Sequence, residues 1–570
     1  MGSISTFFHG PDRTRILGFA MTGIRTFRTV AGGRHFRPPI LPNRPPRRTF
    51  NSYFVTHLPS SSLHPDSRST TGPHHKLPRS ESTPHTPAPG SAPAVAPPYP
   101  PNRDLTVVRI PLRSAKHHYG VANSRGQRGY NEDAHQAGTL SIPAFARRAP
   151  MSVSRQMPKQ AGEGTSADSA FGDPQIFYFG VFDGHGGSEC SEFLRDELHG
   201  YVEDTAAQFK LQSSLQKGTP GLDDPKTDKK DPVAEPKTDL AAIQEGYAKA
   251  VQLEAELLED YKRTVGGYFR RFRPAYFSVT PQSSVDEPCV DPPEQKPITV
   301  ESVLTYAFLR ADLDFITAQA RKPDPDDVHV SDFPLNKDEI LGRPHLPPSG
   351  HGIGGPHRFK GGSTASIALI STPTPAPFWH PASHSTLVVA HVGDTRILLA
   401  ETATGQPHPL TVDHHPSAPS ESRRLRRFAE SLITDSFGEE RIEGLANSRA
   451  FGDMQSKRIG VSAEPDITRV ELGPAQYAFL VLVSDGVSGS LSDQEIVDVI
   501  KEAKTPEEGA RHVVEYATEV SSDGDNATCL VVRLGGWERR SEGGLGSLGT
   551  KEVRDARRAE ALDPRRRGRN

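Results

Sequence analysis

The sequence has few cysteines, almost no net charge and no long apolar run, and each shortage excludes a class of protein. The three cysteines, Cys190, Cys289 and Cys529, stand far apart, which argues against a disulfide framework and against a zinc site. A formal net charge of −3 gives no overall reason to expect nucleic-acid binding. Because no run of about eighteen apolar residues occurs, the sequence predicts no transmembrane segment.

Apolar residues are scarce as well. They make up only 34% of the chain, whereas proline occurs 52 times and glycine 50 times. Chains of this composition contain long stretches that cannot pack into a core. We therefore expect one sizeable folded domain that is embedded in loops and tails.

The first fifty residues differ from the rest of the chain. They contain nine arginines, no lysine and a single acid, Asp12. A basic amphipathic segment that is rich in arginine and poor in acids is typical of a mitochondrial transit peptide, which we assign to residues 1–50. The alternatives are a disordered basic tail and N-myristoylation at Gly2, whose context "MGSIST" fits that modification. Residues 51–104 are rich in proline and serine and are expected to form a disordered linker.

Residues 105–536 contain the apolar patterns that are typical of strands and helices. Short apolar runs predict strands, at residues 176–182, 386–392, 396–400, 477–483 and 527–534. The turn "GDT" between the second and third runs predicts an antiparallel hairpin. Amphipathic helices are predicted over 240–261 and 299–316, and capping patterns predict helix starts at Ser492 and Thr505. The mixture indicates an α+β protein, an antiparallel sheet structure covered by helices.

Segments that form cores poorly interrupt this domain. They are charged and rich in proline, and we expect surface insertions near residues 205–238, 264–298 and 321–358. Residues 537–570 are predicted to form a basic disordered tail. The sequence therefore predicts one folded domain between two unstructured ends, with three insertions in its middle.

Acidic residues stand beside the predicted strands. Six acids have this placement or lie together just upstream: Glu132, Asp133, Asp183, Asp394, Asp485 and Asp525. Asp-Gly pairs are good turn formers, and any one of these acids could serve only a turn. A carboxylate beside a buried strand is nevertheless costly unless it is paired, hydrogen-bonded or bound to metal. Because strand ends of two facing sheets can converge, we expect the acids to form a cluster that needs cations.

The ligand types indicate which cations would bind. No set of cysteines and histidines with zinc spacing is present, so an all-oxygen site for Mn²⁺ or Mg²⁺ is predicted. Two such ions, bridged by one carboxylate, would turn a bound water into hydroxide near neutral pH and hold a phosphoryl oxygen. This is the chemistry of phosphate-ester hydrolysis.

Eight motifs occur in a fixed order: "RGQRGYNEDA", "FGVFDGHGG", "GGSTAS", "AHVGDTRILL", "LTVDHHP", "GLANSRAFGD", "LVSDGV" and "GDNATCLVV". In this order, over about residues 118–535, they resemble the metal-dependent serine/threonine phosphatases of the protein phosphatase 2C type. The resemblance implies a sandwich of two antiparallel β-sheets flanked by α-helices, with the metals at one end. The N-terminal region is similar to that of a mitochondrial, fungal-like member.

The resemblance also implies a set of metal ligands. Asp183 would bridge two metals, and the backbone carbonyl of Gly184 would complete one site. Asp485 and Asp525 would hold the first metal together with Asp183. Glu132 would bind the second.

Three further residues receive roles from the resemblance. Asp133 would act through metal-bound water, and Arg128 would bind the substrate phosphate with its planar guanidinium. His185 would protonate the leaving serine or threonine oxygen as general acid, although a histidine there could also be an ordinary turn residue. A third metal is left open, because Asp394 matches one of its ligands whereas Gly489 stands where the family usually has an acid.

Two rival interpretations belong to other classes. One is a catalytically weak or dead family member that acts as a binding or regulatory module. The other is an unrelated calcium-binding β-sandwich, which would leave Arg128 and His185 unexplained. We expect phosphorylated proteins to be its partners, and we expect the enzyme itself to be a monomer. Mitochondrial relatives act on phosphorylated dehydrogenase complexes, which makes the pyruvate dehydrogenase E1 subunit a candidate substrate.

Overall fold

The computed structural model describes the chain in segments: residues 53–59, 105–111, 117–147, 173–215, 239–278, 298–320, 322, 353–374, 376–426, 433–434, 440–442, 444–521, 523–541 and 546–562. The predicted transit peptide and the greater part of the predicted linker lie outside these residues, as do residues 216–238, 279–297 and 323–352 of the predicted insertions. Cys190 and Cys529 are buried free thiols, and Cys289 lies outside the described residues.

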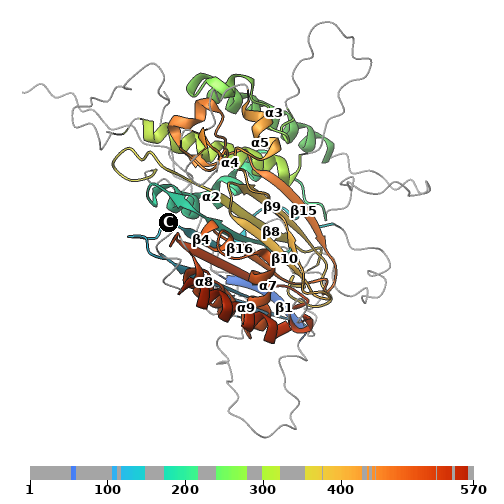
Figure 1. The fold of residues 1–570 in the computed structure, drawn as a ribbon. Helices are drawn as coiled ribbons and strands as arrows, with labels where there is room; N and C mark the ends of the chain where they lie inside the picture. Colours follow the sequence, from blue (N-terminus) through green and yellow to red (C-terminus); the bar gives the residue numbers. More distant parts are fainter. Residues whose placement is uncertain are drawn as a thin grey trace, which may run out of the picture. The chain divides into compact units, whose positions relative to one another are not determined.

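Two five-stranded antiparallel sheets form the centre of the fold (Figure 1). The first sheet contains, in spatial order, β15 (Asp466–Leu472), β9 (Ser385–Val392), β8 (Ala365–Ser371), β5 (Ile176–Phe182) and β4 (Ala134–Leu140). The second contains β11 (Pro407–Pro409), β10 (Arg396–Glu401), β16 (Tyr477–Val483), β17 (Ala527–Arg533) and β3 (Tyr119–Ser124). The α+β sandwich that the sequence predicts is confirmed.

The two sheets pack face to face through large apolar side chains. Successive residues of a strand point to opposite faces, so Phe177 and Phe179 of β5 face the other sheet. There they share one core cluster with Leu480 and Leu482 of β16. Tyr178 points the other way, into a second cluster beneath helices. All seven residues of β5 are buried, which explains why its sequence is an unbroken apolar run.

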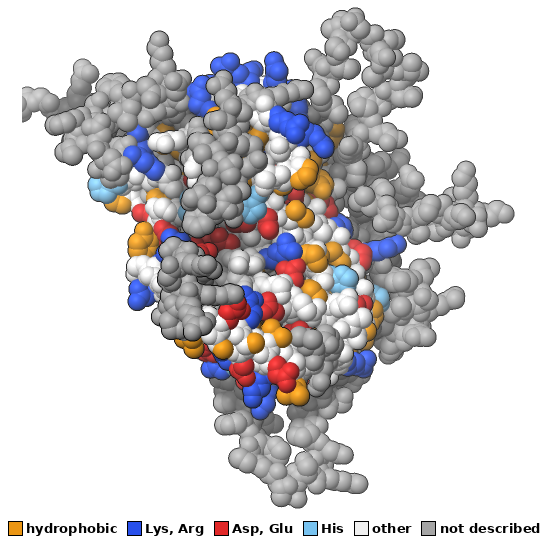
Figure 2. Space-filling model, viewed as in Figure 1, with side chains coloured by type: hydrophobic (Ala, Val, Ile, Leu, Met, Phe, Trp, Pro, Cys, Tyr) orange, Lys and Arg blue, Asp and Glu red, His pale blue; other side chains and the backbone are white. Residues whose placement is uncertain are grey.

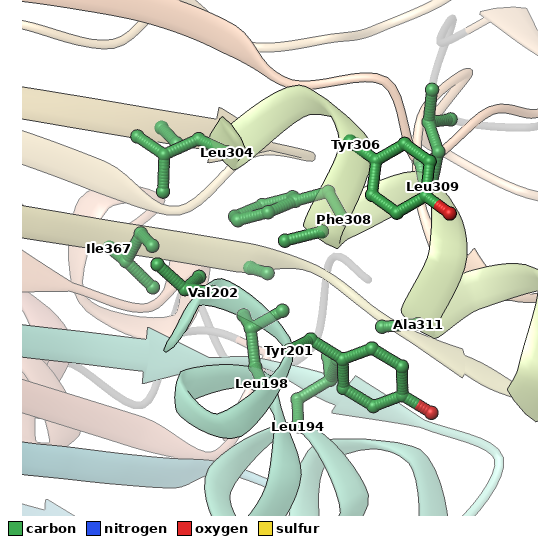
Figure 3. Packing of buried hydrophobic residues seen from close by; sticks show 14 of the residues in the cluster. Leu194, Leu198, Tyr201, Val202, Leu304, Tyr306, Phe308, Leu309, Ala311 and Ile367 are labelled. Atoms are coloured by element: carbon green, nitrogen blue, oxygen red, sulfur yellow. The ribbon is translucent and has the colours of Figure 1, made fainter. Parts of the chain in front are cut away.

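Helices cover the outer face of each sheet. The first sheet is covered by α2 (Glu189–Gln208) and α4 (Val300–Ala320), and α3 (Asp239–Thr264) packs against these two helices. Figure 3 shows side chains of α2, α4 and β8 in this cluster, among them Leu198, Phe308 and Ile367. The second sheet is covered by α7 (Asp493–Glu502) and α8 (Pro506–Val520). Ser492 closes a capping box at the start of α7, and Thr505 caps α8, as the sequence predicts.

The remaining elements are short. Three two-residue strands form a small sheet in the order β14 (Phe451–Gly452), β7 (Gly362–Ser363) and β6 (Gly184–His185). The other elements are β1 (Tyr53–Pro59), β2 (Leu105–Pro111), β12 (Ile433–Thr434), β13 (Glu440–Arg441), α5 (Pro419–Leu425), α6 (Asp485–Ser488), α9 (Gly546–Ala561) and the 3₁₀ helices η3 (Gly267–Arg271), η4 (Met454–Ile459) and η5 (Trp537–Arg539). Within the described part of the chain, no helix is long and apolar enough to span a membrane.

The prediction that residues 386–392 and 396–400 form an antiparallel hairpin is wrong. β9 and β10 do not pair; β9 belongs to the first sheet and β10 to the second. The turn between them carries the chain across the sandwich and places Asp394 at the crossing. Turn residues indicate a sharp change in the direction of the chain, but they do not indicate whether the flanking strands pair with each other.

Several predicted unstructured segments are partly ordered. β1 lies within the predicted linker and pairs with β2. In the predicted insertion 264–298, Phe269 and Phe272 are buried against the ring of Tyr261. The predicted disordered tail contains η5, with a buried Trp537, and α9.

Specific contacts of basic side chains explain why part of the predicted tail is ordered, which its composition alone does not indicate. The α9 side chain of Arg557 donates to Glu495 of α7 at 2.8 Å. The guanidinium of Arg554 lies 5.3 Å from the ring centre of Tyr516 on α8. Basic residues that are typical of a solvated tail therefore hold α9 against two other helices.

Candidate metal centre and active site

Three carboxylates meet where strands of the two sheets end. Asp183 follows β5, Asp394 lies between β9 and β10, and Asp485 follows β16 by two residues. One oxygen of each carboxylate lies within 4.8 Å of the others. The backbone N–H of Asp485 also donates to Oδ2 of Asp183 at 3.3 Å. We call Asp183, Asp394 and Asp485 the three-acid group; the sequence predicts its convergence, and the structure brings it together.

The three-acid group is electrostatically unfavourable by itself. Burial, followed by the charges of Asp485, Asp133 and Asp394, raises the pKa of Asp183 well above its usual range. Burial and the charge of Asp394 raise the pKa of Asp485 to about 7. Carboxylates in this position ionise together only when cations neutralise them. Since all their ligand atoms are carboxylate oxygens, the group fits Mg²⁺ or Mn²⁺.

Asp133 lies beside this group with one oxygen unsatisfied. Its Oδ2 accepts hydrogen bonds from Ser484 Oγ at 2.8 Å and from Thr528 Oγ1 at 2.7 Å. Its Oδ1 is buried and has no hydrogen-bond partner among the described residues. Burial raises the pKa of Asp133 to about 6. A buried carboxylate oxygen without a hydrogen-bond partner, in a residue whose charge acts on Asp183 and Asp485, is what a cation site would require.

Asp525 and Glu132 are not members of the three-acid group. Arg128 donates from Nη2 to Oδ2 of Asp525 at 2.8 Å, and its side chain is 53% exposed, so that the guanidinium is open to a substrate. Asp525 nevertheless acts on the group, because its charge contributes to the raised pKa of Asp485. The side chain of Glu132 accepts a hydrogen bond from the backbone N–H of Gly187.

The backbone around Asp183 is tightly held. Its carbonyl accepts from Thr364 N at 2.8 Å and from Ser363 Oγ at 3.0 Å. At Gly184 a Cβ atom would lie 2.6 Å from the carbonyl oxygen of Glu132, so only glycine fits. Asn526 donates to the carbonyls of Arg125 and Tyr130 and thereby holds the loop before Glu132. The sequence supplies these residues in the quoted motifs, but their supporting roles follow only from the contacts.

His185 is paired with an acid that the sequence analysis did not single out. Its Nε2 lies 2.8 and 2.9 Å from the carboxylate oxygens of Asp453. Burial alone would lower the pKa of His185, but the hydrogen bond and the charge of Asp453 raise it. Protonation, which a general acid requires, is therefore favoured.

The small sheet brings this pair together. In it, His185 of β6 pairs with Gly362 of β7, and Gly362 pairs with Gly452 of β14, the residue before Asp453. A Cβ atom at Gly362 would lie 2.3 Å from Oδ2 of Asp453. Asp453 itself has a φ of 42°, a conformation in which residues other than glycine are uncommon. The signal in the sequence was the final acid of "GLANSRAFGD".

A buried ion pair supports the segment that carries Asp453. Lys457 Nζ of η4 and Asp312 Oδ2 of α4 are 2.8 Å apart, and neither side chain is exposed to solvent. Oδ1 of Asp312 accepts from the N–H of Gly452 at 3.0 Å, and its Oδ2 accepts from the Tyr261 hydroxyl of α3 at 3.1 Å. The segment that carries Asp453, the partner of the candidate general acid, is thus tied to two helices.

Fold and site together define a metal-dependent phosphatase. The family described as Protein phosphatase 2C matches residues 355–525. Protein phosphatase 2C homolog 4 of Schizosaccharomyces pombe is 30% identical over 435 residues, which cover 76% of this chain and 84% of that protein. The chain belongs to the protein phosphatase 2C family and is a protein serine/threonine phosphatase.

Other relatives match a smaller part. Protein phosphatase 1K, mitochondrial, of Xenopus laevis is 36% identical over 177 residues, which are 31% of this chain and 44% of that protein. Among solved structures, serine-threonine phosphatase 2C from Toxoplasma gondii is 18% identical, with a TM-score of 0.38 over 73% of this chain and 94% of that chain.

Proposed function

We propose that the enzyme hydrolyses phosphoserine and phosphothreonine in proteins with two divalent cations, Mn²⁺ or Mg²⁺, held around Asp183. The observation that carries this proposal is the three-acid group, whose buried carboxylates need positive charge beside them. Asp183 and Asp485 would hold the first cation, with Asp525 at its edge. Glu132 and the carbonyl of Gly184 would hold the second.

The cations, when bound, supply Lewis acidity toward water and toward the phosphoryl oxygens. The protein supplies the remaining functions. Ser484 and Thr528 fix one oxygen of Asp133 and leave the other without a hydrogen-bond partner among the described residues. Arg128 binds the substrate phosphate, and His185, held by Asp453, donates a proton to the leaving oxygen.

A third cation would depend mainly on Asp394. This acid belongs to the three-acid group. Gly489 offers no carboxylate beside it, so a third site would have one protein carboxylate fewer than the family pattern. We retain Asp394 as its proposed ligand.

Removal of the cations tests the proposal. Dialysis against EDTA is expected to abolish hydrolysis of p-nitrophenyl phosphate, and added Mn²⁺ or Mg²⁺ is expected to restore it, because the acids cannot hold water or phosphate alone. Zn²⁺ and Ca²⁺ serve as comparison ions. Full activity of the chelated protein would contradict the metal assignment, and no activity with any ion would favour the alternative of a catalytically dead binding module.

We further propose that the enzyme acts in mitochondria, on a phosphorylated dehydrogenase complex such as the pyruvate dehydrogenase E1 subunit. The support is the arginine-rich composition of residues 1–50 and the mitochondrial relative that matches part of the chain.

Fusion of residues 1–50 to a fluorescent protein is expected to direct it into mitochondria. A matched fusion in which the nine arginines are replaced by glutamine should remain in the cytosol, because the positive charge is removed. A diffuse signal from the first fusion, or a myristoylated Gly2 on the protein from cells, would refute the location. Phosphoproteomics of mitochondria with and without the enzyme would then identify the substrate.

A further inference from the structure

Two arginine-rich segments that are far apart in the sequence lie on one part of the surface. Residues 262–278 contain five basic residues and no acid, and residues 423–426 contain three arginines. Five of these arginines are exposed and have no acidic partner among the described residues. Arg273 donates to the carbonyl of Phe272, and the other four are Arg270, Arg271, Arg423 and Arg426. We call these four residues the arginine surface.

Tyr268 is the point at which the two segments meet. The guanidinium of Arg424 lies 5.2 Å from the centre of the Tyr268 ring. A Cβ atom at Gly460, just after η4, would lie 2.8 Å from Leu425 and 3.3 Å from the Tyr268 ring. Since Tyr268 lies within η3 and α5 ends at Leu425, the arginines of both segments flank this contact.

The neighbouring arginines that support the fold are a different set. Arg424 and Arg449 both pair with Glu421 at 2.7 Å, and the Glu421 side chain is only 1% exposed. These two guanidiniums are used inside the protein. The arginine surface has no comparable partner there and is directed to solvent, so its charge is available to another molecule.

An ordinary solvated face would mix charges of both signs. Here one sign predominates, and Figure 2 shows Lys and Arg side chains gathered at the end of the molecule where Figure 1 places α3 and α5. A concentration of one charge raises the encounter rate with molecules of opposite charge and favours their binding.

The arginine surface is built on the same segment as the active site. η4, against which η3 and α5 pack, begins directly after Asp453, the partner of His185. A protein substrate is large enough to contact both places, whereas a small phosphate ester is not. The occupant that this arrangement fits is therefore the substrate chain itself.

We propose that the arginine surface docks acidic side chains that accompany the phosphorylated residue in the protein substrate. The inference rests on the proposed phosphatase function and adds a substrate class to it: phosphoproteins with an acidic segment near the phosphorylation site. Binding at the arginine surface contributes to substrate affinity and leaves the chemical step at His185 unchanged.

The test compares two fourfold variants of the full-length enzyme. The first replaces the arginine surface, as Arg270→Gln, Arg271→Gln, Arg423→Gln and Arg426→Gln. The matched control replaces four exposed basic residues near α8 and α9, as Lys504→Gln, Arg511→Gln, Arg539→Gln and Lys551→Gln. Each protein is assayed with p-nitrophenyl phosphate, with a phosphopeptide of acidic flanks and with one of neutral flanks.

The first variant is expected to raise KM about tenfold for the acidic phosphopeptide at low salt, because several weak exposed ion pairs are lost together. Its rates on the neutral peptide and on p-nitrophenyl phosphate should equal those of the wild type. The difference should vanish near 1 M salt, where screening is nearly complete. The control variant should behave like the wild type on all three substrates.

An unchanged KM for the acidic peptide, or an equal rise in the control variant, would overturn the proposal. Fluorescence anisotropy with an unphosphorylated acidic peptide measures docking without turnover. If the enzyme proves inactive, the proposed function is refuted, but this measurement still tests the docking proposal. If vesicles with anionic lipids bind the wild type but not the first variant, and the peptide KM is unchanged, the surface serves a membrane and the proposal is wrong.

Discussion

Asp183→Asn is expected to lower kcat at least about a thousandfold on every phosphate ester. Asparagine keeps the size and one oxygen of the side chain but removes a charge from the centre of the three-acid group. The metal-free variant should be no less stable than the metal-free wild type, because the substitution also removes repulsion between buried acids. Rates and melting temperatures, each measured with and without Mn²⁺, test both statements.

Stabilisation by metal distinguishes this result from a folding defect. Mn²⁺ should raise the melting temperature of the wild type, since a ligand that binds only the native state stabilises it, and should raise that of Asp183→Asn much less. Asp196→Asn, at an exposed position of α2, is the matched control and should retain activity and metal response. Near-normal turnover by Asp183→Asn would remove the three-acid group from the proposed mechanism.

His185→Ala is expected to lower kcat about a hundredfold or more on a phosphoserine peptide, and less than about tenfold on p-nitrophenyl phosphate. A serine alkoxide must be protonated as it leaves, whereas p-nitrophenolate is stable without a proton. Asp453→Asn should show a smaller split of the same kind, because it keeps a hydrogen-bonding group beside Nε2 but removes the charge that favours protonation.

The two substrates are compared within each variant, so a general loss of folded protein cancels from the ratio. His512→Ala, on the partly exposed side of α8, should leave both rates unchanged. Equal losses on both substrates for His185→Ala would argue that this histidine only shapes the turn after Asp183.

The elements that the sequence predicts well are those whose signals are local. The apolar run 176–182 is β5, and 477–483 is β16, because strands buried on both faces have no reason to alternate. The start of α7 follows from the side chain of Ser492, which caps its own helix. Pairing of β9 with β10 was predicted wrongly, because the choice between two sheets is made by distant strands.

In the candidate site, too, local signals are visible in the sequence and long-range contacts are not. Asp183, Asp394 and Asp485 are marked in the sequence by the strands beside them, and they meet in the structure. Asp453 follows a two-residue strand with a weak pattern, and its importance depends on a contact with His185, 268 residues away. The pairing of Arg128 with Asp525 is likewise set by two loops that only the fold brings together.

The Lys457–Asp312 ion pair links parts of the chain that the sequence alone presents as separable. Tyr261, which donates to Asp312, belongs to α3, a helix that the sequence presents between two insertions and thus as an accessory. Without Tyr261 the ion pair stays in place, but the buried carboxylate of Asp312 loses a hydrogen bond, and a hydrogen bond to a charged group contributes about 1.5–3 kcal/mol. α3 and the segment that carries Asp453 therefore form one structural unit, and a shortened enzyme that omits α3 would weaken the support of Asp453 although no residue of the site had been altered.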